Sequence, residues 1–391
     1  MLQIKTLKTA RALKGKKVLV RTDFNVPLKN GRVSDDFRLR AALPTLKYLR
    51  QQGARVIIVS HLGRPDGKVA PEFGLKVLVP ALTKLLKTSV IFCPENIGPK
   101  AQKAVDDLKS GQILLLENIR FQPGEEKNER ALAKALAGLA DVYVNEAFSV
   151  SHRAHASVCA ITEFLPSYAG LALADEVKNL DEALHPVSPA VAILGGAKIS
   201  TKIGLIKNLA RHFDSVLIGG ALANNFIQAA GFEVGQSVVD ADYQVKIADY
   251  NFQKICLPVD ALVLTVKGEV ATRLVDEVKP KEKILDIGPR TIKIFNQKIA
   301  MAKSIVWNGP MGWFEDPRFK KGTRALALAV KKNLRARAVV GGGETVAAVS
   351  GLINARAQKT RPKLFISTAG GAMLEYLEGK ILPGIKPLIE K

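Results

Sequence analysis

Residues 17–27 read Lys-Val-Leu-Val-Arg-Thr-Asp-Phe-Asn-Val-Pro (KVLVRTDFNVP), an apolar strand-like run that ends in a polar loop. Similar β-branched runs recur along the chain, at 18–20, 56–59, 90–92, 113–116 and 142–144 in the first half and at 191–194, 216–218, 261–266, 305–307, 338–340 and 364–366 in the second. Each is followed by a helical pattern, and continuous apolar strands that alternate with helices are typical of parallel sheets covered on both faces. The sequence therefore predicts an α/β protein with two doubly wound, Rossmann-like parallel-sheet domains.

The two predicted domains divide at a helix that a proline-rich segment ends. Residues 174–184 (ADEVKNLDEAL) have a helical pattern, and the segment HPVSP at 185–189 stops it. We expect a triose-type first domain over 1–172, a hinge helix and linker over 173–189, and a nucleotide-binding second domain over 190–380. Residues 381–391 contain LPGIKP, which is too broken for a regular element, and we expect this tail to pack back toward the first domain.

Length and composition support a folded protein of the cytoplasm. A chain of 391 residues suits two domains, and 47% hydrophobic with 24% charged residues excludes a disordered chain. No apolar run approaches the roughly 18 residues that span a bilayer. The N-terminus is basic, as in a transit peptide, but a strand begins almost at once, so we expect no targeting segment. Cys93, Cys159 and Cys256 are far apart, which suits a reducing compartment and argues against a disulfide framework or a zinc site.

The formal net charge of +22 admits two explanations. One is nucleic-acid binding, and the other is a lysine-rich surface on an enzyme for anionic substrates. The surplus charge is spread along the chain and aromatic residues are only 6%, whereas nucleic-acid binders more often carry a compact basic arm or stacking aromatics. We favour the solvated surface. A metal on His152 and His155 is disfavoured, because Arg153 lies between them and no cysteine or carboxylate cluster is near.

Basic residues follow several predicted strands of the first half at the points where the strands end, in the segments RTDFNVP, HLGRP, ENIRF and NEAF with SHRAH. The carboxyl ends of parallel strands meet at one edge of a sheet, so these side chains should converge on a small acid that carries carboxylate or phosphate. Arg38 and Arg40 open the first helix, where cations oppose the helix dipole and therefore need another reason to be present. Asp23 and Asn25 would accept hydrogen bonds from a substrate hydroxyl, with an ordinary turn as the alternative.

Glycine and lysine follow the predicted strands of the second half. After 191–194 the chain reads GGAKISTK, a glycine turn and an expected helix start with Lys198 and Lys202 on one helical face. This is not a Walker A loop, but such a helix start offers N–H groups to phosphate; a solvated helix face is the alternative. Further glycine turns lie at 219–220, 341–343 and 370–371, and none fits GxGxxG. The sequence predicts a nucleotide held by backbone and lysine rather than NAD, with Glu344 placed to ligate Mg²⁺ on the phosphates.

The chain resembles the phosphoglycerate kinase family in a series of motifs that run in collinear order from about Lys5 to the C-terminus. They are RTDFNVP, HLGRP, LLLENIRF, SHRAHAS, LGGAKIS, LPVD, DIGPRT, WNGPMGWFE, GGGET and LEYLEGKILPG. The resemblance implies Mg²⁺-dependent, reversible phosphoryl transfer from 1,3-bisphosphoglycerate to ADP, which gives 3-phosphoglycerate and ATP. These two pairs of metabolites are the small-molecule substrates. From the composition we expect no membrane and, despite the net charge, no nucleic acid, and we expect a monomer.

The resemblance also implies roles for individual residues. As catalytic residues it implies Arg38, Lys198, Gly343 and Gly370. As binding residues for the acid it implies Asp23, Phe24, Asn25, Arg38, His61, Leu62, Gly63, Arg64, Arg120 and Arg153. For the nucleotide it implies Lys202, Gly219, Gly220, Asn308, Glu315, Gly342, Gly343, Glu344 and Thr345, with Glu344 also as the Mg²⁺ ligand.

The chain departs from the family pattern at several positions. Glu146 stands where aspartate is usual, the segment 149–151 reads SVS in place of GTA, and Thr201 replaces an aspartate between two lysines. Glu344 replaces the aspartate of the metal turn, and Ala369 the first glycine of a triplet. Two alternatives to an active kinase follow: a nucleic-acid-binding protein on the same fold, and a relative that binds nucleotide without chemistry.

Overall fold

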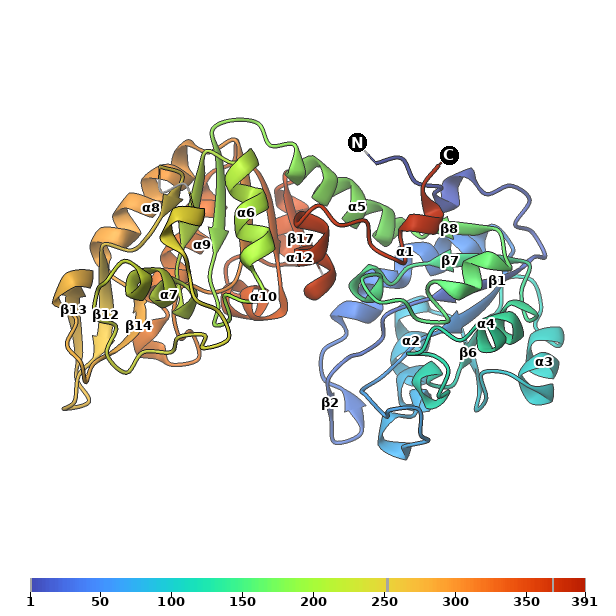
Figure 1. Ribbon diagram of the computed structural model, residues 1–391. Coiled ribbons are helices and arrows are strands. Elements are labelled where there is room, and N and C mark those ends of the chain that lie inside the picture. Colours follow the sequence, from blue (N-terminus) through green and yellow to red (C-terminus); the bar gives the residue numbers. More distant parts are fainter. Residues whose placement is uncertain (1, 251–252, 368, 391) are drawn as a thin grey trace. The chain divides into compact units, whose positions relative to one another are not determined.

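The computed structural model describes residues 2–250, 253–367 and 369–390, and the chain forms two compact units (Figure 1). The first unit comprises Met1–Lys178 together with Ile381–Lys391, and the second comprises Asn179–Lys380. The chain passes from one unit to the other inside helix α5, Leu171–Leu184. No helix among the described residues is long and apolar enough to cross a membrane.

The described part of the first unit contains a parallel sheet of six strands in the order β5-β6-β4-β1-β7-β8. Its strands are β1 Lys17–Arg21, β4 Arg55–Val59, β5 Val90–Cys93, β6 Ile113–Leu116, β7 Val142–Asn145 and β8 Ser167–Ala169. The direction of winding reverses between β1 and β7, which is where open α/β sheets bind their ligands. The strand β8 and a short hairpin, β2 Leu28–Lys29 with β3 Arg32–Val33, were not predicted.

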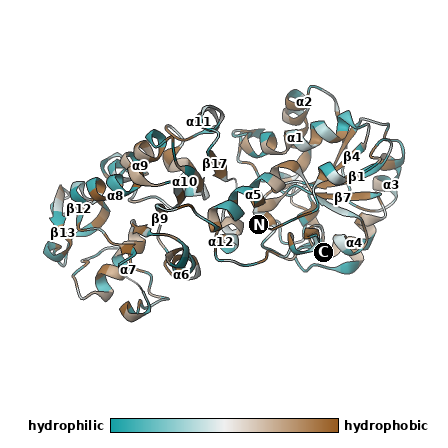
Figure 2. Ribbon diagram, turned by 90° about the horizontal axis from the view of Figure 1, so that it is seen from above, coloured by the Kyte–Doolittle hydropathy of each residue, from teal (hydrophilic) through white to brown (hydrophobic). Residues whose placement is uncertain are grey.

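Both faces of this sheet are buried, as the continuous apolar strands predict. Val18 and Val20 of β1 pack in one hydrophobic cluster, whereas Leu19 between them packs in a cluster on the other face. Alternate side chains of a strand point to opposite faces, so a strand that is apolar throughout must be covered twice. Hydrophobic colouring accordingly gathers along the sheets, with helices outside them (Figure 2). The helices are α1 Phe37–Gln51, α2 Val79–Leu86, α3 Pro99–Asp106 and α4 Arg130–Ala137.

The described part of the second unit contains a parallel sheet of six strands in the order β11-β10-β9-β15-β16-β17. Its strands are β9 Ala190–Leu194, β10 Ser215–Ile218, β11 Ile255–Cys256, β15 Ser304–Asn308, β16 Arg337–Gly341 and β17 Leu364–Ser367. The helices are α6 Ile203–His212, α7 Ala221–Ala229, α8 Pro289–Met301, α9 Lys321–Lys332, α10 Gly343–Val349, α11 Ala355–Thr360 and α12 Gly371–Leu377. This is the doubly wound order of dinucleotide-binding folds, with its switch point between β9 and β15. The predicted fold class is confirmed.

One predicted strand lies in a different sheet from the one expected. Residues 261–266 were expected in the parallel sheet, but β12, Asp260–Leu264, pairs antiparallel with β13, Val270–Leu274, and β14, Lys283–Ile287. Neither neighbour was predicted. No residue of β13 is buried, and the strand (VATRL) lacks the apolar run by which a buried strand is identified.

The C-terminal tail runs along the first unit. The N–H of Gly384 donates to the carbonyl of Ser151 (2.8 Å), and Ile389 forms an antiparallel bridge with Ile4. The expectation that this tail has no regular element is wrong at one point, because Lys386–Leu388 form a single 3₁₀ turn. Pro387 is its second residue, where a missing N–H costs no hydrogen bond.

Candidate active site

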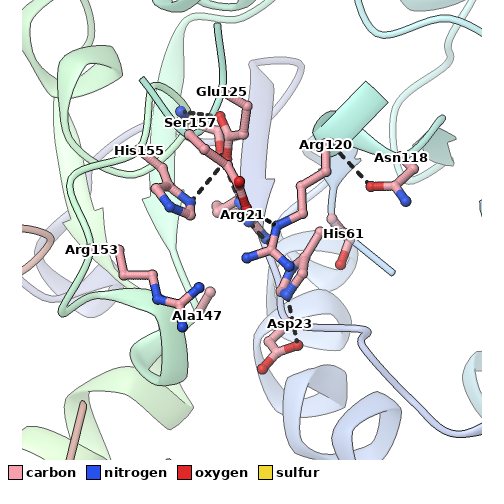
Figure 3. A network of polar contacts seen from close by, with 12 residues as sticks. Arg21, Asp23, His61, Asn118, Arg120, Glu125, Ala147, Arg153, His155 and Ser157 are labelled. Carbon is pink, nitrogen blue, oxygen red and sulfur yellow. Dashed lines mark hydrogen bonds and ion pairs between the residues drawn. The ribbon is translucent and has the colours of Figure 1, made fainter. Parts of the chain in front are cut away.

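The predicted acid-binding residues of the first unit converge at the carboxyl ends of β1, β4, β6 and β7 (Figure 3). Asp23 follows β1, His61 follows β4, Arg120 follows β6, and Arg153 lies in the loop after β7. Arg38 enters from the first turn of α1. The convergence that the strand-end pattern predicts is therefore present in the fold.

Asp23 is the central acceptor of this site. Its Oδ2 lies 2.5 Å from Nη1 of Arg38 and also accepts the hydroxyl hydrogen bond of Ser149, while its Oδ1 accepts the N–H of Asn25 at 3.0 Å. Burial by itself would raise the pKa of Asp23, but the positive charge of Arg38 and these hydrogen bonds act in the opposite direction, and the pKa is lowered to about 2. Asp23 is therefore ionised at any physiological pH. It also gives Arg38 the further partner that its position at a helix start demands.

His61 is a buried, neutral ring at the centre of the cluster. Burial, with repulsion from Arg21 and Arg120, lowers its pKa well below the ordinary value, although Asp23 acts in the opposite direction. The standing positive charge that faces Asp23 is therefore Arg38. The Nε2 atom of His61 lies 3.8 Å from Oδ1 of Asp23.

The turn around Gly63 is tied to two predicted site residues. The N–H of Gly63 donates to Oδ1 of Asn25 (2.9 Å), and its carbonyl accepts from Nη1 of Arg120 (2.7 Å). The side chain of Asn25 thus shapes the loop through its amide oxygen, which has a second lone pair for a substrate hydroxyl. Arg64 is exposed beside this turn.

Two predicted binding residues have side chains inside the hydrophobic core. Phe24 and Leu62 are 0% and 3% exposed and pack in the same cluster as Val18. The family resemblance assigns these positions without distinguishing side chain from backbone. In this structure only their main-chain groups can face a ligand, and the N–H of Phe24 already donates to Ser60 Oγ at 2.9 Å.

The remaining cations of the site have protein partners of their own. Nε of Arg120 lies 3.0 Å from Oε1 of Glu126, an exposed carboxylate. Arg153 is half-buried and donates through Nε to Nε2 of His152 (3.2 Å). A dianionic ligand would compete with the exposed carboxylate of Glu126 for the buried guanidinium group of Arg120.

A buried network beneath this site was missed in the sequence. Arg21 and Glu125 are both fully buried, with Nη2 of Arg21 3.6 Å from Oε1 of Glu125. Ser157 joins them: its hydroxyl accepts from Nε of Arg21 (2.7 Å) and donates to Glu125 (2.6 Å). Arg21 is the first residue of the motif RTDFNVP and the last residue of β1, but nothing in the sequence indicated that this arginine is buried.

The second unit contains a cavity of about 670 Å³ at the carboxyl ends of its central strands. Its walls are largely apolar and come from the loop after β9, the turn before α7, the antiparallel strands β12 and β14, and the segment Pro310–Arg318. Of the predicted nucleotide-binding residues, the lining includes Gly220, Glu315 and Glu344. The apolar wall was missed because it depends on β14, a strand that was not predicted. Cavities of this size and character are typical sites for small ligands.

The glycine turns at this edge pack against one another. A Cβ on Gly220 would lie 2.8 Å from the nitrogen of Gly196, and one on Gly309 would lie 2.2 Å from the carbonyl oxygen of Gly195. Both residues also have positive φ. The sequence suggested that these glycines let a ligand approach the backbone, whereas here they let neighbouring turns approach each other. Gly219 belongs to the same set, since a Cβ there would meet Met311.

The two predicted lysines do not share a helical face. Helix α6 begins at Ile203, so Lys198 lies in the preceding turn and is exposed, while Lys202 is the N-cap residue. Lys202 is buried and donates from Nζ to the carbonyl of Gly195 (2.5 Å). The expectation is wrong because the helix begins only after Lys202, so Lys198 lies outside it, and the carbonyl of Gly195 holds the ammonium group of Lys202. Burial lowers the pKa of Lys202 to about 8, although Glu344 opposes this shift.

Lys202 and Glu344 face each other across Gly196. Nζ of Lys202 and Oε2 of Glu344 lie 3.0 and 4.0 Å from the place that a Cβ on Gly196 would occupy. Glu344 and Gly196 line the apolar cavity, and the ammonium group of Lys202 lies beside Gly196 without lining the cavity itself. This arrangement fits the polyphosphate of a nucleotide and one bound divalent cation.

The other predicted residues of the second unit shape the turns. The N–H of Gly309 donates to Oγ1 of Thr345 (2.6 Å), and Asn308 donates to the carbonyl of Gly341 (2.9 Å). Gly342 precedes α10 and packs against Asn308, whereas Gly343 and Gly370, at the starts of α10 and α12, have open space where a Cβ would be. Gly343, Gly370 and Lys198 are not among the residues that line the cavity.

The residues present fit a Mg²⁺ ion that is carried mainly by phosphates. Within residues 2–250, 253–367 and 369–390, no group of three or more His, Cys, Asp or Glu side chains could form a protein cage for a metal. Glu344 lines the cavity beside Gly196 and offers a hard oxygen ligand there. Mg²⁺ is commonly held by one or two carboxylates with substrate phosphates and water.

Comparison with known proteins gives one consistent result. The sequence model of the family described as phosphoglycerate kinase matches residues 7–380. The phosphoglycerate kinase of Caulobacter sp. strain K31 is 45% identical over 98% of this chain and 99% of its own length, and that of Dictyoglomus turgidum is 45% identical over 97% of each. The solved structure of phosphoglycerate kinase from Coxiella burnetii aligns with a TM-score of 0.85 at 39% identity, covering 99% of both chains. That from Pyrococcus horikoshii OT3 aligns with a TM-score of 0.84 at 31% identity, covering 98% of both.

Proposed function

This chain belongs to the phosphoglycerate kinase family, and from that premise we propose that the two described sites hold the acid and the nucleotide of one phosphoryl transfer. The reaction moves the acyl phosphate of 1,3-bisphosphoglycerate to ADP and is reversible. The observation that carries the proposal is the position of Lys202 and Glu344 on either side of Gly196, which lines the 670 Å³ apolar cavity together with Glu344. Such a cavity suits a base and ribose, and its polar end suits the phosphates and their cation.

In the first unit, the proposed acid site binds a molecule that carries both phosphate and carboxylate. Arg64, Arg120 and Arg153 supply guanidinium groups that bind such anions through paired hydrogen bonds. Asp23 accepts from a substrate hydroxyl, and His61 donates to the acid as a neutral ring. Arg38, which Asp23 orients, is the proposed catalytic arginine that stabilises negative charge on the transferred group.

In the second unit, the proposed nucleotide site places the base against the apolar wall and the ribose at Glu315. Lys202 binds the phosphates, and the exposed Lys198 reaches the transferred group. The amides of Gly343 and Gly370 open two helices with free N–H groups near the phosphates; these helices are short, so we assign them a supporting role only. Glu344 and the substrate phosphates would hold Mg²⁺, whose positive charge would offset the negative charge of the transferring group.

Phosphoryl transfer depends on in-line placement and on neutralisation of charge more than on acid–base chemistry. Both substrates must therefore be held in line and shielded from water at the moment of reaction, or hydrolysis competes. We propose that the segment 173–189, which contains most of α5, is the hinge about which the two units move. Within the proposal the enzyme is a cytoplasmic monomer.

The alternatives raised by the sequence have less support. The relatives named above are called phosphoglycerate kinases, and none is named as a nucleic-acid-binding protein. A relative without chemistry would lack a group that the transfer needs, yet Arg38, Lys198 and Lys202 are all present.

The test is a coupled assay of ATP formation from ADP and 1,3-bisphosphoglycerate, run with and without Mg²⁺. We expect Mg²⁺-dependent ATP formation. Nucleotide binding without turnover, measured by calorimetry on the same preparation, would show instead a relative that has lost its chemistry.

A further inference from the structure

Arg21 has no part in the roles assigned so far, although it is the largest charged side chain that is fully buried among the described residues. It ends β1, two residues before Asp23. Its guanidinium group is held on several sides at once: Nε donates to Ser157 Oγ (2.7 Å), and Nη1 donates to the carbonyl of Thr22 (2.5 Å). Glu125 faces Nη2 at 3.6 Å. A buried arginine with so many fixed partners has little freedom to move toward a ligand.

The remaining contact of Arg21 is with His61. Both Nη1 and Nη2 lie 3.3 Å from Nδ1 of the His61 ring. A guanidinium group has only donors, and a neutral imidazole has one donor nitrogen and one acceptor nitrogen. Nδ1 must therefore be the acceptor, which leaves the ring proton on Nε2.

We propose that Arg21 is a positioning residue that fixes His61 as the tautomer with its proton on Nε2, and so makes His61 a hydrogen-bond donor to the acid. This inference rests on the proposed function, because it deepens the role of His61 in the acid site. Arg21 touches no substrate and acts through the ring alone.

The direction of the ring gives this tautomer a use. Nε2 lies 3.8 Å from Oδ1 of Asp23, beyond the usual length of a hydrogen bond. The N–H on Nε2 is thus directed toward the side of the cluster where Asp23 and Arg38 lie. The opposite tautomer would present a lone pair there, which would repel a carboxylate or phosphate oxygen.

Glu125 and Ser157 hold Arg21 in the position that this role requires. Both oxygens of Glu125 are tied to Ser157, through its hydroxyl (2.6 Å) and its N–H (2.9 Å). The same segment carries Arg153, so the Glu125–Ser157 contacts also anchor the loop after β7. The group that hydrogen-bonds to the second ring nitrogen commonly sets the tautomer and orientation of a functional histidine.

The first test uses the wild-type enzyme. In ¹⁵N-labelled protein at pH 7.5, two-bond ¹H–¹⁵N correlation spectra report which ring nitrogen of each of the five histidines carries the proton, and a His61→Gln sample assigns the His61 signals. We expect a single His61 tautomer, protonated on Nε2. A proton on Nδ1, a mixture of tautomers or a doubly protonated ring would overturn the inference.

The second test uses Arg21→Lys, which keeps the charge but loses the fork of donors. We expect both His61 tautomers to appear and the KM for 3-phosphoglycerate to rise by about tenfold, the equivalent of one hydrogen bond to a charged group. The KM for ATP should not change. The matched control is Arg130→Lys, an exposed arginine paired with Glu163 in the same unit, for which we expect wild-type constants. An unchanged tautomer with an unchanged KM in Arg21→Lys would refute the positioning role.

Ser157→Ala is the milder variant if Arg21→Lys does not fold, because it removes one contact of Arg21 and keeps the others. The same changes, smaller in size, are expected. Addition of 3-phosphoglycerate to the wild-type sample separates this inference from the proposed function. A single Nε2–H tautomer whose signals ignore the acid would support the role of Arg21 and contradict the acid site.

Discussion

Nη1 of Arg38 lies 2.5 Å from Oδ2 of Asp23, so the arginine proposed for catalysis is held by a carboxylate of the acid site. Arg38 lies in the first turn of α1 and Asp23 follows β1, so the contact joins the start of a helix to the end of a strand. Asp23 is ionised because its pKa is lowered to about 2. This pairing orients the guanidinium group before any ligand arrives, which is how preorganised charge lowers a barrier.

Arg38→Ala should lower kcat by about 10³–10⁵-fold, the range for arginine donors in phosphoryl transfer. Arg38 is 35% exposed, so its removal should leave the fold intact, as judged by circular dichroism. Arg38→Lys should recover only part of the rate, because lysine lacks the planar fork. A turnover number like that of the wild type in folded Arg38→Ala would exclude the catalytic assignment.

ADP affinity should fall as the pH rises through about 8. Burial lowers the pKa of Lys202 to about 8, so this lysine is charged below that pH and neutral above it, and only the charged form attracts phosphate. Isothermal titration calorimetry between pH 7 and 9.5 should show a rising Kd. In Lys202→Arg, whose side chain stays charged, the Kd should be flat over this range. A flat wild-type profile would contradict the role of Lys202.

Glu344→Ala should raise the Mg²⁺ concentration for half-maximal activity by on the order of tenfold. Glu344 is the carboxylate beside Lys202 at the end of the cavity, and its loss leaves the ion with phosphates and water alone. Glu344→Asp keeps a hard oxygen ligand and should stay close to the wild type. Glu269→Ala, on an exposed hairpin of the same unit, is the control. In calorimetry, the Mg²⁺ concentration needed for tight ADP binding should likewise be highest for Glu344→Ala. Equal Mg²⁺ dependence in the wild type and the three variants would show that Glu344 does not bind the metal.

Glu146→Gln should reduce the loss of stability between pH 5 and pH 8. Glu146 is buried where α5 begins and accepts from the N–H groups of Ala172 (3.2 Å) and Leu173 (3.3 Å). Burial raises its pKa from 4.5 to about 8, so the folded state favours the protonated form. The stabilisation is complete below pH 4.5 and is lost as the pH rises toward 8, by at most about 1.4 kcal/mol per pH unit.

Urea unfolding of Glu146→Gln, followed by circular dichroism at pH 5 and pH 8, measures this effect, since glutamine is neutral at both values. Glu163→Gln removes an exposed carboxylate of the same unit and is the control. If wild type and Glu146→Gln lose the same free energy of unfolding between the two pH values, Glu146 does not titrate as described.

Most of the parallel sheets could be predicted, because their strands are short apolar runs that are buried on both faces. The edge strands β8 and β11 could not, nor could β13 and β14, the two antiparallel neighbours of β12, because these strands are short or half-exposed and lack that signal. The sheet of β12 was predicted wrongly for the same reason, because its two neighbours were not recognised as strands. The residues of β12 are apolar enough for the parallel sheet or the antiparallel one, and only its pairing with β13 and β14 decides in which sheet it lies.

The sequence by itself determined the chemistry of both sites: basic residues after the strands of one half, and glycine, lysine and Glu344 after those of the other. These follow from the rule that parallel strands end at one edge of a sheet. Only the tertiary structure showed which side chains of the sites hydrogen-bond to the protein's own backbone, as Asn25 does with Gly63 and Lys202 with Gly195. It also revealed Arg21 and Glu125 beneath the site, because burial and the direction of a hydrogen bond depend on segments more than a hundred residues apart in the chain.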